Sequence, residues 1–559
     1  MKKTIKLKKM ALLCLTLIGW AGAAQAETVN VSTQAEFASA YTTAANATEG
    51  TETTIVMAAG NYDGTGGLSN QLKFPSKHAV TLKAAEGAEV TLSIKVRNTD
   101  ASAAGSLIFD GIKIIPTDNY FMDFGDTKSD TSNKSNIGDL IFRNCEITSE
   151  GSFNRSLIYG GNSEKNINSI VVENCRIHDC GTGYVFIRPT HMVKSFSATG
   201  NTMYNYGGEG FFHPQTLYPG TGFVATFSNN TIYKWSKDGG WYLLNLRAYA
   251  NNQSANSATI TINDNIIWGM KDTRTQDSRV LRYDATVGKV VMKNNLIYEW
   301  AVWYGERCED KTVSNLTTAD VDAALVEGGN FKVPPFANAS EGDFTLDITN
   351  YPKLATCSSV GSLIGAPQHG KYVLTVSDAK AATLTLPFAT TIPDGVEAYT
   401  LSYTSGDKAT ATPVATTLPA HTPVLINADG GLYTFTATGT VESEAVTTPQ
   451  SGSLTGAYVL TNVPTDSYVL QNNNDKVGFY KVTSEAPQQI NPFRAYLTAG
   501  SEARMLGIGF DGEITGISAL QNDTERMADD RIFYDLQGRR VAQPSKGLYI
   551  VNGKKVMVK

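Results

Sequence analysis

The stretch "ITINDNII" (residues 260–267) alternates aliphatic and polar side chains over four residues, then places Asp264 and Asn265 before two isoleucines. Alternation with a period of two is typical of a strand that buries one face. Asp and Asn tolerate the left-handed backbone of a tight bend. The stretch therefore predicts a strand, a sharp bend and a second, short strand.

Variants of this phrase recur along the chain. They read "LIFDGIKI" (107–114), "LIFRNCEI" (140–147), "IVVENCRI" (170–177), "SFSATGNTM" (195–203), "ATFSNNTI" (225–232) and "VVMKNNLI" (290–297). Gly, Asn or Asp occupies the bend, at positions 111, 144, 174, 200, 229, 264 and 294, in steps of 26 to 35 residues. Helical solenoids hold their repeat length more tightly, so strands with variable turns favour a parallel β-helix. We expect the bend asparagines also to hydrogen-bond to one another between coils.

The repeated phrases resemble the right-handed parallel β-helix proteins of the pectate lyase and chondroitinase-B type. More narrowly, they resemble exported β-helix proteins of Bacteroidota. The resemblance covers roughly residues 27–369. It implies a right-handed coil stack, and it leaves activity open, because such folds also serve as adhesins and stalks.

The first 26 residues predict a signal peptide, with five lysines before a short apolar run and a small-residue site after Ala26. The run is too short to span a membrane, and no later transmembrane segment is expected. Without those lysines the formal charge of −6 becomes −11. So acidic a chain is a poor general binder of nucleic acid, and affinity for an anion would need a local basic patch. A secreted or outer-surface location follows as an expectation.

Five cysteines remain after residue 26, and their odd number does not suggest a disulfide framework. Cys145 and Cys175 follow the bend asparagine in adjacent coils, so we expect them to stack. Whether they form a disulfide stays open. No Cys/His cluster has the spacing of a zinc site.

A second strand in each coil carries the candidate site. In "YVFIRPT" (184–190), "EGFFHPQ" (209–215), "YLLNLRAY" (242–249) and "SRVLRYD" (278–284), a basic residue follows the apolar core. Equivalent positions of successive coils lie about 4.8 Å apart. The expected result is a basic column on one face, formed by Arg188, His213, Arg247 and Arg282.

Arginine makes two-point contacts with carboxylate or sulfate, and aromatic faces pack on sugar rings. The column therefore predicts binding of an acidic polysaccharide, with Arg188, Arg282, Tyr283 and Trp241 as substrate-binding residues. A polysaccharide lyase that acts by β-elimination is an alternative, with His213 or Arg247 as the base and Tyr283 as the acid. That alternative adds Ca²⁺ as a candidate cofactor, and otherwise no cofactor or metal ligand is expected. A non-catalytic structural or adhesive stalk is the third reading.

The rest of the chain also reads as β structure. Residues 328–347 and 351–368 are interpreted as the closing coil and exit of the helix, and residues 370–510 as a β-sandwich-like module. Residues 511–559 resemble the C-terminal sorting domain of type IX secretion, through "YDLQGR" (534–539), "KGLY" (546–549) and "VMVK" (556–559). This resemblance implies the secretion machinery as a partner. The expected fold class is all-β.

Overall fold

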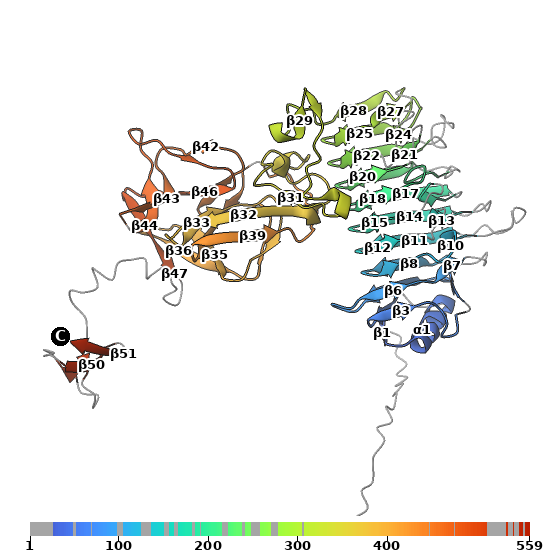
Figure 1. Cartoon of the computed structure of the whole chain (residues 1–559), viewed down its shortest axis with the longest axis horizontal. Helices are drawn as coiled ribbons and strands as arrows, with labels where there is room; N and C mark the ends of the chain where they lie inside the picture. Colours follow the sequence, from blue (N-terminus) through green and yellow to red (C-terminus); the bar gives the residue numbers. More distant parts are fainter. Residues whose placement is uncertain are drawn as a thin grey trace, which may run out of the picture.

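In the computed structural model, the described residues are 26–47, 52–68, 70–97, 104–124, 136–149, 156–160, 166–180, 185–189, 192–214, 222–236, 241–246, 258–269, 278–304, 307–446, 448–474, 476–510 and four strands within 533–558. The chain is all-β, and its N-terminal part is a right-handed parallel β-helix, as the repeated phrases predicted. Figure 1 shows the coils stacked from α1 at one end to β27 and β28 at the other.

Three parallel sheets run the length of the stack, and we name them A, B and C. Sheet A contains β1 (Glu27–Val31), β2 (Glu52–Met57), β5 (Ala79–Ala84), β8 (Ser106–Asp110), β11 (Asn136–Arg143), β14 (Asn166–Glu173), β17 (Met192–Thr199), β19 (Val224–Ser228), β22 (Thr259–Asn263), β25 (Lys289–Lys293) and β28 (Asp310–Ser314).

Sheet B follows the bend of each coil. It contains β3 (Gly60–Tyr62), β6 (Val90–Leu92), β9 (Lys113–Ile114), β12 (Glu146–Thr148), β15 (Arg176–His178), β18 (Thr202–Tyr206), β20 (Thr231–Trp235), β23 (Ile266–Trp268) and β26 (Leu296–Tyr298). Sheet C has two parts. They are β4 (Gln71–Lys73), β7 (Lys95–Arg97), β10 (Tyr120–Asp123), β13 (Ser156–Tyr159) and β16 (Ile187–Arg188), then β21 (Tyr242–Asn245), β24 (Arg279–Arg282) and β27 (Ala301–Tyr304).

The helix α1 (Gln34–Asn46) caps the N-terminal end of the stack. Its start is set by Thr33, whose hydroxyl accepts from the Glu36 N–H, while Glu36 accepts from the Ser32 N–H and hydroxyl. This reciprocal arrangement satisfies donors at the helix start. Phe37 and Tyr41 are buried, and the Tyr41 hydroxyl donates to the Lys73 carbonyl at 2.7 Å. The cap therefore covers apolar coil side chains that would otherwise face water.

The sequence suggested two roles for one asparagine of each coil, forming the bend and hydrogen-bonding to the next coil. In the structure, two adjacent residues share these roles. The bend residues adopt left-handed backbone, with φ of 54° at Asn144, 61° at Asp264 and 53° at Asn294. The hydrogen-bonded ladder is formed by the residues one position later. Its fully buried members are Asn201, Asn230, Asn265 and Asn295. The expectation that the bend asparagines bond to one another was therefore wrong by one residue.

Within the ladder, each carboxamide oxygen accepts from the preceding coil. Asn265 Oδ1 accepts from the Asn230 N–H at 2.9 Å and from Asn230 Nδ2 at 3.0 Å. Asn265 Nδ2 in turn donates to the Phe227 carbonyl at 2.8 Å and to Asn295 Oδ1 at 2.8 Å. Every side-chain polar atom of these buried amides makes a hydrogen bond. This is the condition under which a polar network can be kept in a core.

Cys145 and Cys175 occupy the ladder position in the two coils before Asn201. Both are buried, and all five described cysteines are thiols rather than disulfides. Burial and the neighbouring Cys145 raise the pKa of the Cys175 thiol well above its ordinary value. The Asn201 carboxamide accepts from the Cys175 N–H at 2.9 Å, so the amide ladder starts on this thiol pair.

The segment after β28 is not the closing coil that the sequence suggested. Residues 326–331 form an antiparallel hairpin, β29 (Val326–Glu327) with β30 (Asn330–Phe331), because Gly328 and Gly329 supply the positive φ of its turn. Four short 3₁₀ turns also lie in this region, the first of them directly before the hairpin. They are η1 (Ala323–Leu325), η2 (Ala339–Glu341), η3 (Leu354–Thr356) and η4 (Pro367–His369).

The segment between β28 and β32, residues 315–369, lies across sheet B, and we call it the exit segment. The Phe344 ring packs on Tyr204 with centroids 4.9 Å apart and on Tyr233 at 5.8 Å. Asp264 accepts from the Ser359 N–H and hydroxyl, both at 2.6 Å. His369 Nε2 lies 2.5 Å from the Thr202 hydroxyl oxygen. Aromatic contact and buried hydrogen bonds thus join the exit segment to the coils.

A β-rich module follows, beside sheet B in Figure 1. A three-stranded sheet contains β31 (Leu346–Asp347), β32 (Gly370–Val376) and β39 (Gly431–Thr436). A ten-stranded sheet contains, in spatial order, β33 (Ala381–Leu384), β38 (Val424–Ala428), β35 (Val396–Ser402), β36 (Lys408–Val414), β47 (Met505–Phe510), β44 (Lys476–Lys481), β43 (Ser467–Asn473), β46 (Arg494–Thr498), β41 (Leu454–Ala457) and β40 (Gln450–Ser451).

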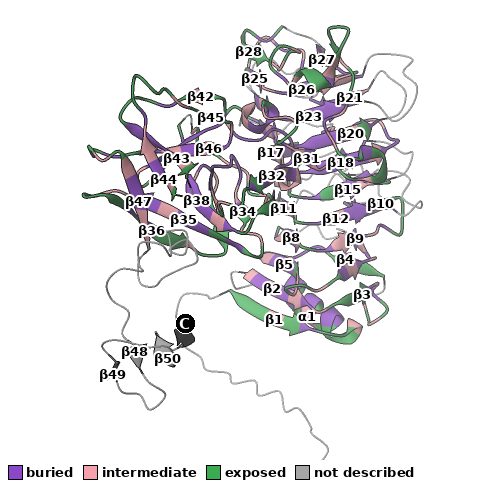
Figure 2. Ribbon diagram, turned by 60° about the vertical axis from the view of Figure 1, so that its left-hand side comes forward, coloured by how far each residue is buried: buried purple, intermediate pink, exposed green. Residues whose placement is uncertain are grey.

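Small pairings complete the chain. They are β34 (Thr390–Thr391) with β37 (Thr417–Leu418), β42 (Thr461–Asn462) with β45 (Gln489–Ile490), and the C-terminal sheet of β48 (Phe533–Tyr534), β49 (Arg540–Val541), β50 (Gly547–Val551) and β51 (Lys554–Val558). Figure 2 shows that buried residues line both the coils and the strands of the module. One apolar cluster contains Leu296 of sheet B and Leu374 of β32, so the two regions share a core.

We expect Asn265→Ala to lower the free energy of unfolding by at least about 3 kcal/mol, because each unsatisfied buried group costs about 1–3 kcal/mol. The substitution removes acceptors and donors used by Asn230, Phe227 and Asn295. Urea unfolding followed by tryptophan fluorescence measures the change. Asn294→Gly is the matched control: its φ of 53° suits glycine, so a change below about 1 kcal/mol is expected. Equal losses in both variants would contradict the division between bend and ladder.

Because His369 is buried, we expect the folded protein to lose stability in mild acid. Burial, and secondarily Arg176, lower its pKa from 6.5 to about 4. Between these values the unfolded state binds the proton and the folded state does not. Stability is therefore complete above about pH 6.5 and falls by about 2–3 kcal/mol as the pH approaches 4.

Thermal unfolding of the protein and of His369→Gln, measured from pH 7 to pH 4, isolates this contribution. The variant should show a shallower decline than the unaltered chain over this range, since its amide does not titrate. Parallel declines would mean that His369 does not couple protonation to unfolding.

Candidate functional site

The strand register identifies which residues stack on sheet C. Parallel bridges join Ile187 to Phe212 and Phe212 to Leu244, and Leu244 pairs with Leu281. Phe212 therefore connects the two parts of the sheet, although its coil has no strand there. Its ring is buried and stacks on Phe196 at 3.9 Å.

The residue after each bridge position belongs to one outward column. Arg188, His213 and Arg282 lie at equivalent positions, as the sequence predicted. In the coil between His213 and Arg282 the position belongs to Asn245, which pairs with Arg282. The position that the sequence had suggested for Arg247 therefore belongs to Asn245, because the apolar run of β21 ends earlier than assumed. Arg247 itself lies outside the described residues.

The column continues into the earlier coils. Arg188 pairs with Tyr159, Tyr159 with Asp123, Asp123 with Arg97 and Arg97 with Lys73. We call these positions the sheet C column: Lys73, Arg97, Asp123, Tyr159, Arg188, His213, Asn245 and Arg282. Sequence reasoning missed Lys73 and Arg97. The signal was present, since "QLK" (71–73) and "KVR" (95–97) also place a basic residue after an apolar one.

Sheet C faces away from the C-terminal module in Figure 1. Arg188, His213 and Arg282 are half-buried and Lys73 is exposed. The Arg282 guanidinium lies over the Tyr242 ring, 4.9 Å from its centroid, a geometry that orients a cation without neutralising it. Trp241 is also half-buried, and its carbonyl accepts from the Arg279 N–H at 2.9 Å. Trp241 thus directly precedes β21, and Arg282 ends the neighbouring strand β24.

Tyr283 does not belong to this surface. Its side chain is fully buried, and its hydroxyl donates to the Val287 carbonyl at 2.7 Å. Burial raises its pKa to about 12. The alternation of β24 explains the error: Arg282 points outward, so the next side chain enters the core. Tyr283 therefore cannot contact a ligand at the sheet C column in this structure.

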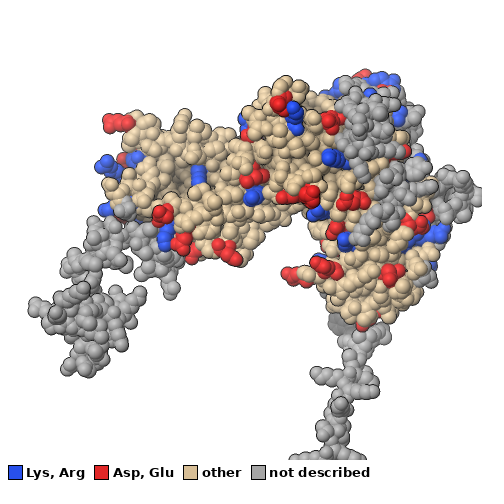
Figure 3. All heavy atoms as spheres, viewed as in Figure 1, with Lys and Arg blue, Asp and Glu red and all other residues tan. Residues whose placement is uncertain are grey.

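One acidic residue, Asp123, interrupts the column in its early coils, and Lys95 links it to the neighbouring Asp118. Lys95 Nζ lies 2.9 Å from Asp118 and 3.4 Å from Asp123, whose side chain is 4% exposed. Burial lowers the pKa of Lys95, but the two carboxylates outweigh it and the pKa is raised. Lys95 also lowers the pKa of Asp118. Figure 3 shows basic side chains gathered beside β7 and β10.

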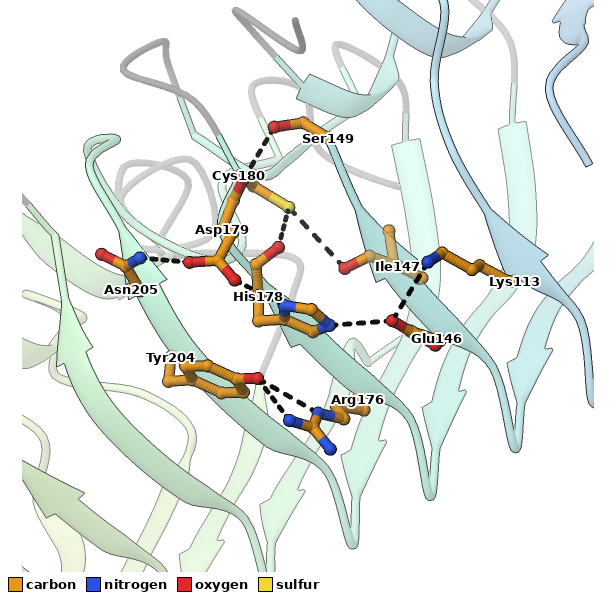
Figure 4. A network of polar contacts seen from close by, with 10 residues as sticks. All are labelled: Lys113, Glu146, Ile147, Ser149, Arg176, His178, Asp179, Cys180, Tyr204 and Asn205. Carbon is orange, nitrogen blue, oxygen red and sulfur yellow. Dashed lines mark hydrogen bonds and ion pairs between the residues drawn. The ribbon is translucent and has the colours of Figure 1, made fainter. Parts of the chain in front are cut away.

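A second polar cluster, unforeseen from the sequence, lies on sheet B (Figure 4). His178 contacts two carboxylates: Nδ1 lies 2.7 Å from Asp179 and Nε2 lies 3.1 Å from Glu146. Glu146 also pairs with Lys113 at 3.6 Å, and Asp179 accepts from Asn205. The signal that could have found it lies two positions after the first three bends, where Lys113, Glu146 and Arg176 alternate in charge.

Arg176 and Tyr204 extend this cluster toward the exit segment. Arg176 donates to the Tyr204 hydroxyl through Nε at 3.1 Å and Nη2 at 2.6 Å, while Tyr204 stacks on His178 at 4.9 Å. Phe344 packs on the same tyrosine. The charges of the cluster largely pair with one another. Its geometry therefore suits a structural role, in which Tyr204 is held in place for its contact with Phe344 of the exit segment.

Neither surface shows a metal centre. Among the residues that the structure describes, no three His, Cys, Asp or Glu side chains are grouped so that they could hold a metal ion. Within the same residues, no helix combines the length and apolar character needed to cross a membrane. No protein-family model matches the chain, and a search of curated proteins finds no match.

Proposed function

We propose that this protein binds an acidic polysaccharide along the sheet C column. The observation that supports the proposal most is the register, which stacks Arg188, His213 and Arg282 on one outward face. Arg188 and Arg282 are three coils apart, about 14 Å at the usual strand spacing. A ligand that reaches both must be extended and must carry repeated negative charge.

The composition of the face supports the same ligand class. The chain is acidic overall, and its net negative charge would repel polyanions. The contacts must therefore come from a local basic column. Guanidinium groups suit carboxylate and sulfate through two parallel hydrogen bonds. Tyr242 adds half-buried aromatic surface under Arg282, and the half-buried Trp241 directly precedes Tyr242 in the chain. Beyond Tyr159 and Asp123, Arg97 and Lys73 add two further basic positions toward the N-terminal coils.

We also infer action outside the cytoplasm. The support is the basic and apolar pattern of the first 26 residues together with the sorting-like phrases near the C-terminus. On this proposal the chain is delivered by the secretion machinery to the cell surface or the medium, where acidic glycans are encountered. If deletion of residues 511–559 removes the protein from the cell surface and the medium while its amount inside the cell is retained, a sorting role is supported.

The binding proposal predicts that Arg188→Ala and Arg282→Ala each weaken binding to chondroitin sulfate or pectate about tenfold, as expected for loss of one charge-assisted contact. Affinity electrophoresis and calorimetric titration of the mature protein measure this. Added salt should weaken binding further, because the contacts are ionic. Lys289→Ala is the control, since it removes one exposed positive charge from sheet A in the coil that follows Arg282. An equal effect of Lys289→Ala, or no binding to any polyanion, would refute the sheet C site.

The same samples test the lyase alternative. It is supported by the position of the His213 imidazole between the two arginines, where it could act as a base. β-Elimination creates an unsaturated uronide that absorbs ultraviolet light. A rise in absorbance, with or without Ca²⁺, that disappears in His213→Ala would establish a lyase at this column. Binding without a rise would favour a lectin-like role, and absence of both would favour the stalk.

A further inference from the structure

The ten-stranded sheet of the C-terminal module carries an open pocket of about 370 Å³. It lies where β33, at one end of the sheet, comes close to β46. Two hydrogen bonds hold this seam: Arg494 Nη1 donates to the Thr383 carbonyl at 2.9 Å, and the Ala495 N–H donates to the Thr383 hydroxyl at 3.0 Å. The volume falls within the range of about 300–1,000 Å³ that is usual for small-ligand sites.

The pocket has an apolar floor and an amide-rich rim. Val469, Ile490 and Ala495 are buried beneath it. Four carboxamide side chains line the rim: Gln471, Asn472, Gln489 and Asn491. A carboxamide both donates and accepts, and so does a hydroxyl group, so this rim suits a ligand rich in hydroxyls.

Arg494 gives the pocket its charge. It is half-buried and is the one charged residue among the described residues that line the pocket, and no acidic side chain lines it. Only Nη1 of its guanidinium is used in the bond to Thr383, so a fork of further N–H donors remains for a ligand. That fork matches a carboxylate.

The rim amides differ in how far they are already engaged. Gln489 Nε2 donates to Asn462 Oδ1 at 2.7 Å, which holds its side chain in place. Asn472 and Asn491 are exposed and make no side-chain hydrogen bond to any residue within the described part of the chain. Gln489 therefore offers a fixed acceptor, Oε1, on the same rim as the two uncommitted carboxamides.

We propose that this pocket binds a small, hydroxyl-rich carboxylate, of which a uronic acid unit is the chemical type. Arg494 would hold the carboxylate, and Asn472, Asn491 and Gln471 would meet the hydroxyl groups. No aromatic side chain lines the pocket among the described residues, so recognition rests on charge and hydrogen bonds, and discrimination between charged and uncharged sugars should be strong. The site is separate from the sheet C column and does not depend on the function proposed for it.

The test uses methyl β-glucuronide as the probe and methyl β-glucoside as its uncharged counterpart, with the full mature chain. Saturation-transfer difference NMR and competition titration measure both affinities. We expect the glucuronide to bind at least about tenfold more tightly than the glucoside, as a charge-assisted contact is gained. Arg494→Gln should reduce the glucuronide to the level of the glucoside. Arg504→Gln, an exposed arginine of the same module outside the pocket, is the matched control and should bind as the unaltered chain does.

Two further variants make every outcome decisive. Asn491→Ala should weaken the glucuronide several-fold while leaving the seam bonds intact, so it replaces Arg494→Gln if that variant fails to fold. The double variant Arg188→Ala/Arg282→Ala should retain glucuronide binding, which separates this site from the sheet C column. Equal affinity for both glycosides, undiminished binding in Arg494→Gln and Asn491→Ala, or no binding by the unaltered chain would each overturn the proposal.

Discussion

Successive coils of the β-helix pair in parallel and in register, and this backbone hydrogen bonding determines where every surface residue lies. It converts a step of about thirty residues in sequence into a step of one strand spacing in space. Sheet A keeps this register through eleven strands, from β1 to β28. A loop of any length can leave a turn without disturbing the coils above and below it. Side chains from distant coils can therefore form a continuous column.

The interior is arranged to keep that register. Aliphatic residues stack at the inward positions, and a buried carboxamide ladder runs beside the bend from Asn201 to Asn295. A slip of one residue would turn the apolar side chains outward and separate the amides, so both patterns select the same register. α1 covers the N-terminal end, where the repeat itself has no further coil to pack on. The exit segment covers the later part of sheet B with Phe344 and its neighbours.

The outward faces of sheets B and C consequently have different environments. Sheet B is bound by the exit segment, and its polar cluster around His178 is largely satisfied by internal ion pairs. Sheet C lies on the far side from the module, and its arginines stand half-buried along one column. For this reason the proposed polyanion surface is placed on sheet C. The module beyond adds its own pocket, whose described lining includes one guanidinium and four carboxamides.

Much of this could be predicted from the chain alone. The repeated phrase determined the parallel β-helix, because strand alternation and left-handed bends are local properties of a few residues. It also placed Arg188, His213 and Arg282 on one column, since they follow comparable apolar runs. The sequence did not identify Asn245 as a member of the column, and it placed Tyr283 wrongly, because one residue of register decides whether a side chain faces water or the core, and loop lengths conceal that register.

Only the tertiary structure decided which asparagines bond to one another. The bend and the ladder are adjacent in sequence, and their different roles depend on the coils above and below. Only the tertiary structure, too, brought Thr383 to Arg494 and Phe344 to Tyr204. Such contacts join segments more than a hundred residues apart whose local patterns contain no information about one another. Local propensity thus determined the coil, while long-range packing decided which surfaces stay open.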